Sequence, residues 1–285
     1  MTTITKPGLY DLEAADYHSD PVPEGSLSQS RAKVLLDEGG PAIFHHKENS
    51  PRVEKKEFDE GTVIHALILG KGMERIEVLD FPNYTTKAAR EARDAAYAKG
   101  LTPLLTKDMA RAQKVADSIP DHIRQLFTGG EAEVSMFWRH TSGLWLRGQM
   151  DYYVAGGRIV DLKTMNDTSN RGLSRAVWNL RYYMQAAWYR RGVEAITGER
   201  LPYLIVGIEK TAPYLTRAVE LTDDYLAVGE AHMDDAIATY LTCVETGHWP
   251  GHPDRTQRLG PPPWVRDDIA ADTITALEEL IEGAA

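Results

Sequence analysis

Residues 148–164 read GQMDYYVAGGRIVDLKT, and this stretch decides the fold of the chain. Residues 152–154 are aromatic and β-branched strand formers, and Gly156-Gly157 is a turn signal. Residues 158–164 then resume the strand pattern. The stretch therefore predicts a β-hairpin.

The predicted hairpin gathers charged side chains at one point. Successive side chains alternate across a strand, so Asp161 and Lys163 share one face. Val160 and Leu162 then point the other way, into a core. The turn can bring Asp151 back beside Asp161. Two carboxylates and one ammonium are thus expected around a single point.

This set of groups suits metal-dependent hydrolysis of a phosphodiester. Mg²⁺ or Mn²⁺ takes carboxylate oxygens and polarises a phosphate. A lysine two residues from such a carboxylate can hold or deprotonate the attacking water, and it can offset charge on the phosphorane. An Asp-x-Lys pair alone is a weak signal, because an ordinary strand can end in a surface ion pair. The upstream Asp151 strengthens it.

Two further patterns flank this stretch. In chain order the three motifs are Gly61-x-x-x-His65, Asp151 followed by Asp161-x-Lys163, and Gln185-x-x-x-Tyr189. Their order resembles the PD-(D/E)xK nuclease superfamily, and within it the RecB-like branch. With an opening that contains Tyr17-His18 and Leu27-Ser28-Gln29-Ser30, the sequence is most similar to the RecE-type exonucleases of phages and prophages (exonuclease VIII), over residues 10–250 or so.

The resemblance implies a restriction-endonuclease-like α/β core, in which helices flank a mixed central β-sheet, with a helical N-terminal part and a helical insert. It also implies a divalent metal, Mg²⁺ or Mn²⁺. The metal ligands that it assigns are Asp151, Asp161, the Leu162 carbonyl and His65. Lys163 then serves the attacking water. A surface or hydrogen-bonded role is the alternative for His65, because a lone helix histidine is usually structural.

The resemblance also assigns roles to Gln185 and Tyr189. Gln185 can orient a phosphate, a base or a metal-bound water, and Tyr189 can hydrogen-bond a phosphate or stack on a base. Tyr182 falls on the same helix face as both residues. The alternative is that the aromatic side chains are core residues of an amphipathic helix, and we favour this interpretation for Trp188.

One more metal ligand and a set of DNA contacts are predicted. Glu133 lies on the strand before Asp151 and can supply a further carboxylate, although Glu131 competes for this role and either can be a solvated strand-face residue. The candidate DNA contacts are Ser28, Arg31, Arg171, Arg175 and Tyr182. For the first two, helix capping and solvation are the alternative. Residues 171–191 are locally basic.

Composition limits the class of protein. The 285-residue chain has 42% hydrophobic and 26% charged residues, no apolar run of membrane-spanning length and no secretory signal pattern. Its single cysteine excludes an intramolecular disulfide and a four-cysteine zinc or iron–sulfur site. We therefore expect a cytoplasmic protein without a membrane partner. A phage or prophage gene in a bacterial host is the origin that the resemblance implies. The net charge of −10 counts against a DNA-binding protein.

The remaining patterns predict the elements and the domains. Helices are expected near residues 28–37, 42–47, 57–69, 173–197 and 223–247, and strands near 75–81, 132–140, 144–154, 158–164, 203–209 and 214–221. We expect an irregular entry arm (1–26), then a nuclease domain (27–250) with a helical insert at about 86–128. A proline-rich linker and a helical tail (251–285) follow.

The leading hypothesis is a metal-dependent exonuclease of linear double-stranded DNA. No G-x-x-x-x-G-K-[ST] loop is present, so the chain has no ATP motor of its own. The resemblance implies 5′→3′ digestion, a 3′ single strand for a phage annealing protein, and a closed ring (trimer or tetramer) whose inner channel alone need be basic. The alternatives are an endonuclease, a flap or single-strand nuclease, and a non-catalytic DNA-binding module.

Overall fold

The predicted hairpin is the centre of the fold. The computed structural model describes residues 2–50 and 60–260. Strand β6 (Trp145–Val154) and strand β7 (Arg158–Met165) pair antiparallel, with Tyr152 opposite Val160. The turn between them contains Gly156 at a φ of 64°, a conformation that glycine adopts readily. The hairpin prediction is confirmed.

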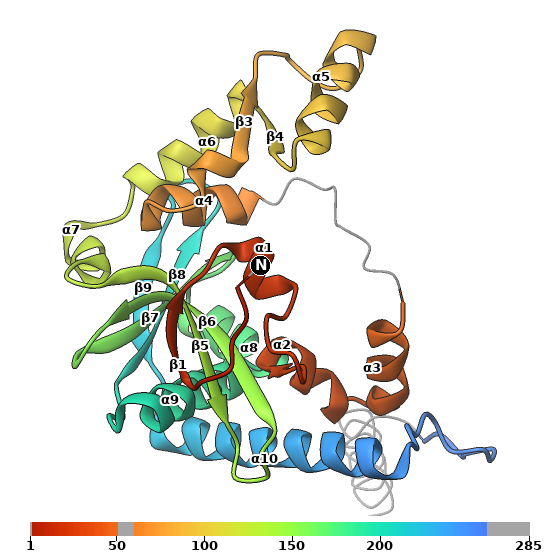
Figure 1. Cartoon of the computed structure of the whole chain (residues 1–285). Coiled ribbons are helices and arrows are strands. Elements are labelled where there is room, and N and C mark those ends of the chain that lie inside the picture. The colour runs from red at the N-terminus through yellow and green to blue at the C-terminus, as the bar shows by residue number, and fades with distance from the viewer. Residues whose placement is uncertain (1, 51–59, 261–285) are drawn as a thin grey trace, which may run out of the picture. The chain divides into compact units, whose positions relative to one another are not determined.

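In the described residues, seven strands form one mixed sheet around this hairpin (Figure 1). Its order is β1 (Gly8–Asp11), β5 (Glu131–Arg139), β6, β7, β8 (Tyr203–Glu209) and β9 (Thr216–Glu220), and β2 (Leu27–Ser28) pairs with β6. Strands β7 and β8 run parallel, as do β2 and β6, while the other pairs are antiparallel. The predicted mixed sheet is therefore confirmed.

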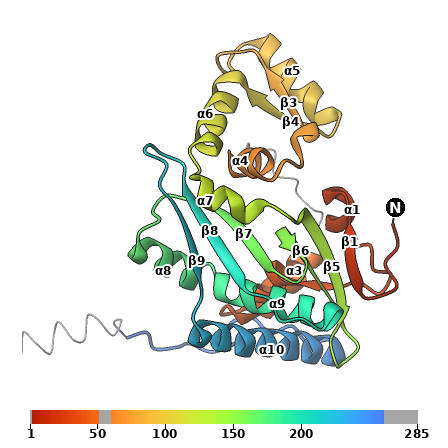
Figure 2. The ribbon, with the colours of Figure 1, turned by 90° about the vertical axis from the view of Figure 1, so that its left-hand side faces the viewer.

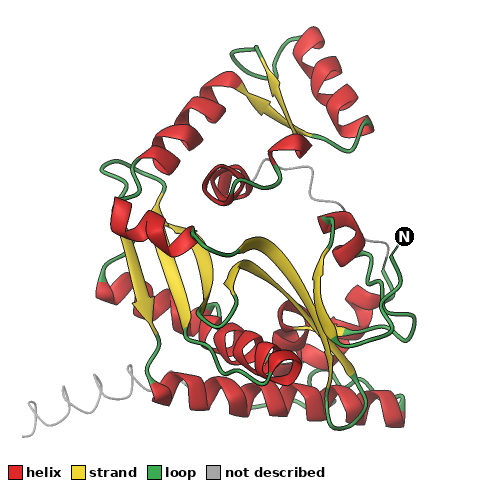
Figure 3. Ribbon diagram, turned by 60° about the vertical axis from the view of Figure 1, so that its left-hand side comes forward, coloured by secondary structure: helices red, strands yellow, loops and turns green. Residues whose placement is uncertain are grey.

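Helices cover both faces of the sheet (Figures 2 and 3). On one face, α9 (Tyr182–Thr197) and α10 (Asp223–Thr246) share a core with inward side chains such as Met150 and Ile159. On the other face, α4 (Glu60–Leu69) and α6 (Thr106–Asp117) pack on Val160, Leu162 and Val206. Val160 and Leu162 are fully buried, as the alternation of the strand predicts.

Shorter elements complete the described chain. They are α1 (Ala14–His18), α2 (Gln29–Ala32), the 3₁₀ turn η1 (Lys33–Leu36), α3 (Gly40–Glu48), η2 (Met73–Arg75), β3 (Ile76–Leu79), α5 (Lys87–Ala98), β4 (Thr102–Leu105), α7 (Asp121–Arg124), η3 (Gln125–Phe127) and α8 (Asn170–Asn179). None of the helices that the structure describes is both long and apolar enough to cross a membrane.

The entry arm contains regular secondary structure, so the prediction of an irregular arm is wrong. Its β1 pairs with β5, so that Gly8 lies opposite Phe137, and α1 follows. Ile4 and Tyr17 are buried in a small core with Phe137. A four-residue strand carries too few alternations to be seen in the sequence alone. The arm belongs to the compact unit of residues 1–251, and a second unit begins at His252.

The predicted helical insert contains a strand. Strand β4 pairs parallel with β3, and Pro103 lies opposite Glu77. Proline donates no hydrogen bond to a neighbouring strand, so Pro103 disfavours a strand at this position. Proline is nevertheless tolerated at the edge of a sheet. The predicted start of the α4 helix at Glu57 and the predicted tail helix (265–282) lie outside the described residues.

The helix predicted over residues 173–197 is two helices, α8 and α9. The chain turns between them at Arg181, whose φ of 56° lies in the left-handed region. The Arg181 guanidinium donates to the Lys33 carbonyl at 3.1 Å and to Asp37 at 2.7 Å. These partners are remote in sequence, and no glycine or proline marks the break, so local patterns could not predict it.

Candidate active site

Three predicted residues meet where β7 faces α9. The Lys163 ammonium lies 2.8 Å from one oxygen of Asp161 and 2.7 Å from the other. The Gln185 amide donates to Asp161 Oδ1 at 2.9 Å. Asp161 is 1% exposed. A buried carboxylate is thus fixed from two sides by its own strand and by the first turn of α9.

Asp151 joins this group from β6. The backbone N–H of Leu162 donates to Asp151 Oδ2 at 2.7 Å. The register between β6 and β7 ends at Tyr152 and Val160, so this side-chain bond takes over where the backbone ladder stops. Asp151 therefore ties the hairpin together beside Asp161, as the predicted geometry requires.

His65 comes from α4, on the other face of the sheet. Val63 and Ile64 are fully buried in the core beneath β7, and they fix the position of the helix. His65 Nδ1 lies 3.9 Å from Asp151 Oδ2. His65 also lines a cleft of about 730 Å³ that Leu162 and Lys163 share. The structure therefore brings the G-x-x-x-H motif to the two aspartates.

Glu133 lines the same cleft. The pairs Ala132–Tyr152 and Val134–Met150 leave Glu133 and Asp151 at facing positions of β5 and β6. The backbone of Glu133 has a φ of 51°, a left-handed conformation within a strand. Burial raises the pKa of its carboxyl group. The competing residue Glu131 is exposed at the start of β5.

Burial dominates the electrostatics of the site. It raises the pKa of Asp161 to about 6, although the Lys163 ammonium opposes the shift, and the Asp151 carboxylate adds to it. Burial raises the pKa of Asp151 as well. For Lys163, burial alone would lower the pKa, but the two carboxylates outweigh it and the pKa is raised. One ammonium therefore faces a buried carboxylate, Asp161, and a partly buried one, Asp151.

The donor groups fit a hard divalent cation. Carboxylate oxygens suit Mg²⁺ and Mn²⁺, and a neutral imidazole such as that of His65 suits Mn²⁺ somewhat better. Lys163 neutralises only one of the two charges of Asp151 and Asp161. Among the residues that the structure describes, no three His, Cys, Asp or Glu side chains converge as a metal cluster. Of the predicted ligands, His65, Glu133 and Leu162 line one cleft, and Asp151 and Asp161 lie next to its lining residues His65 and Lys163, so a cation would have to draw these groups closer.

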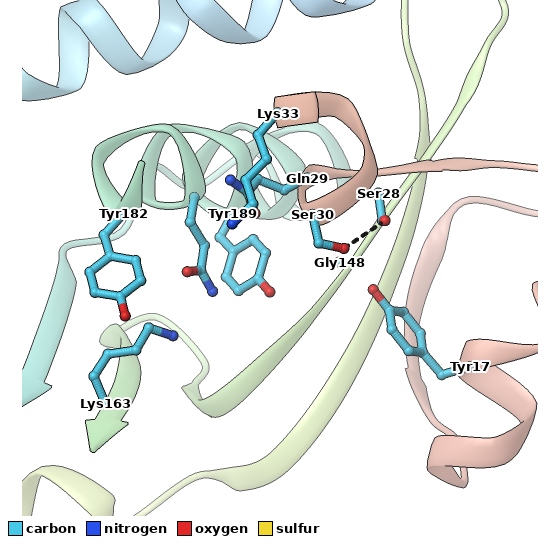
Figure 4. Close-up of a pocket in the computed structure, with 10 residues that line it drawn as sticks. Tyr17, Ser28, Gln29, Ser30, Lys33, Gly148, Lys163, Tyr182 and Tyr189 are labelled. Carbon is cyan, nitrogen blue, oxygen red and sulfur yellow. Dashed lines mark hydrogen bonds between the residues drawn. The ribbon is translucent and has the colours of Figure 1, made fainter. Parts of the chain in front are cut away.

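A second pocket lies on the α2 side of Lys163 (Figure 4). It has a volume of about 280 Å³, and its lining includes Tyr17, Ser28, Gln29, Lys33 and Tyr189. Gln29 is 7% exposed, and its buried Nε2 has no hydrogen-bond partner among the described residues. A buried amide without a partner is a group that a ligand can satisfy.

Sequence reasoning did not assign Gln29 or Lys33, although the motif Ser28-Gln29-Ser30 was noted. The nearby Gly148 leaves room for Tyr189, since an added Cβ would lie 2.9 Å from its ring. Trp188 has the structural role that we favoured. It is fully buried, and its indole N–H donates to the Arg147 carbonyl at 3.0 Å.

The predicted DNA contacts separate into two groups. Ser28 lines the second pocket, and Arg175 lines a separate groove of about 500 Å³. Tyr182 lines the cleft, the second pocket and this groove. Ser28 makes no side-chain capping bond. Arg171 is exposed on α8. The Arg31 guanidinium, in contrast, donates to Glu48 and to the Ser26 carbonyl, each at 2.8 Å, which indicates a structural role.

Comparison with known families agrees with this geometry. Residues 42–259 match the family described as a PDDEXK-like domain of unknown function. The chain belongs to this PDDEXK-like family. The match covers most of the sequence, including all three motifs. The predicted membership of the PD-(D/E)xK superfamily and its fold are therefore confirmed.

Among solved structures, a protein from Eubacterium rectale described as a candidate exonuclease is 18% identical, with a TM-score of 0.61 over 90% of this chain and 98% of that chain. This likeness concerns the PDDEXK-like fold. An alkaline exonuclease from Laribacter hongkongensis is 13% identical over 65% of this chain and 89% of its own, and its TM-score of 0.26 is too low to carry weight. No curated protein matches the sequence.

Proposed function

We propose that the protein is a divalent-metal-dependent deoxyribonuclease that digests linear double-stranded DNA from its ends. The observation that carries the proposal is the meeting of Asp151, Asp161 and Lys163 at the edge of an open cleft. A scaffold protein has no need to hold a buried carboxylate and a partly buried one beside a single ammonium, because such a set is costly to fold around. Membership of the PDDEXK-like family supports a nuclease.

In this proposal Asp151 and Asp161 hold Mg²⁺ or Mn²⁺, with the Leu162 carbonyl and His65 as further ligands. When bound, the cation polarises the scissile phosphate and lowers the pKa of water. Glu133, which lines the cleft beside His65, is proposed to supply a further carboxylate ligand.

The two carboxylates beside Lys163 raise its pKa, which favours one of its two proposed roles. An ammonium that keeps its proton at neutral pH is a poor base, so Lys163 holds the attacking water by donating to it and offsets charge that develops on the phosphorane. The Gln185 amide donates to Asp161 Oδ1 and keeps that carboxylate in place. Tyr189, at the second pocket, contacts the nucleic acid.

The finer features of the activity are also proposals. They are 5′→3′ polarity, independence of ATP, and release of 3′ single strands for phage recombination through an annealing protein. The resemblance to RecE-type exonucleases supports them, and the description of the Eubacterium rectale neighbour as a candidate exonuclease supports only digestion from an end. A closed ring fits the net charge of −10, since only the surface that faces DNA need then be basic.

The test compares linear duplexes, labelled at either the 5′ or the 3′ end, with closed circular duplex in Mg²⁺ or Mn²⁺ and without ATP. We expect early loss of the 5′ label, later loss of the 3′ label and intact circles. Cleaved circles would show an endonuclease instead. Binding of DNA without any cutting would leave only the non-catalytic module.

A further inference from the structure

A third groove opens beside Lys163, at the end of β7. Its volume is about 500 Å³, and its lining includes Thr164, Met165, Arg175, Leu180, Tyr182 and Lys210. Thr164 and Tyr182 also line the cleft that holds His65 and Lys163. The groove therefore adjoins the candidate active site.

The lining of this groove combines two kinds of side chain. Met165, Ala176 and Leu180 are apolar, and Arg175 and Lys210 are cationic. Asp167 is the acidic group of the lining, and its carboxylate accepts a hydrogen bond from the Ser169 N–H at 2.8 Å. An apolar surface beside two cations matches the two parts of a nucleotide, a flat base and a phosphate.

The apolar corner of the groove is exposed. Leu180, which lines the groove, is 48% exposed. Trp178, in the last turn of α8, is 54% exposed. Neighbouring exposed apolar side chains are uncommon away from binding sites. The place of Leu180 in the lining of a groove beside the active-site cleft indicates contact with substrate rather than incidental exposure.

The corner is also held rigidly. Arg181 keeps its left-handed backbone through bonds to Lys33 and Asp37, and the Trp178 ring stacks on Tyr183 with ring centroids 5.3 Å apart. Thr168 follows the lining residue Asp167 and Glu209 precedes the lining residue Lys210, and Thr168 donates to Glu209 from both its N–H and its hydroxyl, at 2.8 and 2.9 Å. A preorganised site loses little entropy when a ligand binds.

We infer that this groove holds one unpaired nucleotide of the DNA strand that the Lys163 site cuts, with its base on Leu180 and its phosphates beside Arg175 and Lys210. A volume of about 500 Å³ suits a ligand of nucleotide size and not a duplex. A paired end must therefore open before its strand occupies the groove. This inference rests on the proposed nuclease function and adds a subsite to it.

The base contact is tested by measuring the binding free-energy coupling between Leu180 and each base of a DNA strand. Divalent metal is left out, so that binding is measured without cutting. A short fluorescent single strand is titrated with wild type and Leu180→Ala, and a single abasic nucleotide is moved along the strand. Loss of one base contact weakens binding by about tenfold. We expect one position in the strand at which removal of the base abolishes the effect of Leu180→Ala, so that the variant causes no further loss of affinity there.

Val244, an exposed residue of α10 with 54% exposure, is the matched control. Val244→Ala should leave both the affinity and the abasic profile unchanged. If the losses from Leu180→Ala and from the abasic nucleotide multiply at every position, the base does not contact Leu180 and the inference fails.

The phosphate contacts have their own readout. Each phosphate contact adds about 0.7 to the slope of log affinity against log salt for a single strand. We expect the double variant Arg175→Ala with Lys210→Ala to lower that slope by about 1.4. Lys114→Ala, on the exposed side of α6, should not change it. Equal slopes for wild type and the double variant would contradict the inference.

These outcomes are distinct from failure of the proposed function. If wild type neither binds nor cuts DNA, the nuclease proposal itself fails. If wild type cuts DNA, but Leu180, Arg175 and Lys210 show no coupling and no change of slope, only the subsite is wrong.

Discussion

At the scale of single residues, the side-chain contacts of Lys163 control the charge balance of the site. Strand alternation placed Lys163 and Asp161 on one face, which the structure confirms. Asp161 is fully buried and Lys163 is partly buried, and the ammonium lies 5.0 Å from the centre of the Tyr182 ring. These contacts depend on α9, which packs onto the sheet from elsewhere in the chain.

The first prediction concerns stability and pH in metal-free buffer. Asp161 has a raised pKa of about 6, so the folded state holds more protons than the unfolded chain and its stability falls as pH rises from about 4 to above 6. Lys163 opposes this loss. In Lys163→Met the pKa of Asp161 rises further, so the variant should lose more stability at pH 8 than at pH 5.

The melting temperature at the two pH values measures this difference. Breaking a buried ion pair costs about 3–5 kcal/mol, so a shift of many degrees is expected at pH 8. Mn²⁺ should stabilise the variant, because a cation then replaces the missing charge. Lys114→Met is the surface control. A deficit that is the same at both pH values would contradict the assignment.

The second prediction concerns Gln185. Its amide bond to the buried Asp161 is a hydrogen bond to a charged group, worth about 1.5–3 kcal/mol. Gln185→Met keeps the length of the side chain and removes that donor. We expect metal-dependent cleavage to slow by about ten- to hundredfold. Gln113→Met, which removes an exposed bond to Asp117 on α6, should leave the rate unchanged. An active Gln185→Met variant would show that the bond has no role in positioning.

At the scale of elements, the sequence predicted correctly the elements that depend on residues close together in the chain. The hairpin of β6 and β7 follows from strand formers and a glycine turn, and the sequence placed it correctly. The break between α8 and α9 follows from the Arg181 contacts with Lys33 and Asp37, more than a hundred residues away. The second pocket was missed for the same reason, because α1 and α2 from the N-terminal part complete it.

The third prediction concerns the packing of β6 against α9. A Cβ at Gly148 would lie 2.4 Å from the Met136 methyl and 2.9 Å from the Tyr189 ring. Such overpacking costs about 1–3 kcal/mol. Gly148→Ala should therefore lower stability in a urea titration and displace Tyr189, which reduces cleavage.

Gly251→Ala is the matched control, because a Cβ there meets its nearest neighbour, Ala42, at an ordinary 3.6 Å. Equal stability of the two alanine variants would show that the β6–α9 contact is looser than the structure indicates.

At the scale of the whole molecule, the N-terminal part belongs to the fold. Ile4, Leu12 and Tyr17 are buried, and Tyr17 also lines the second pocket. The fourth prediction is that a chain without residues 1–26 is strongly destabilised, because it loses β1 and this small core. Thermal unfolding of the shortened chain measures the effect. A melting temperature equal to that of the full chain would mean that the arm is dispensable for the fold.

The proposed ring gives the fifth prediction. With a net charge of −10, one subunit repels DNA over most of its surface, so end-dependent digestion should require an assembly that confines the duplex. Analytical ultracentrifugation should show a trimer or a tetramer at the concentrations at which DNA is digested. A monomer that digests long duplexes without release would contradict the ring.

The central claim is that Asp151, Asp161 and Lys163 form a metal-dependent hydrolytic site. Its most direct test is single-turnover cleavage of end-labelled linear duplex by wild type, Asp161→Asn and Lys163→Ala, with Mg²⁺ or Mn²⁺ and with chelator. We predict cleavage by wild type only with metal, and losses of about a hundredfold or more for each variant while DNA binding is retained. Cleavage that persists in chelator, or variants that cut as fast as wild type, would contradict the account.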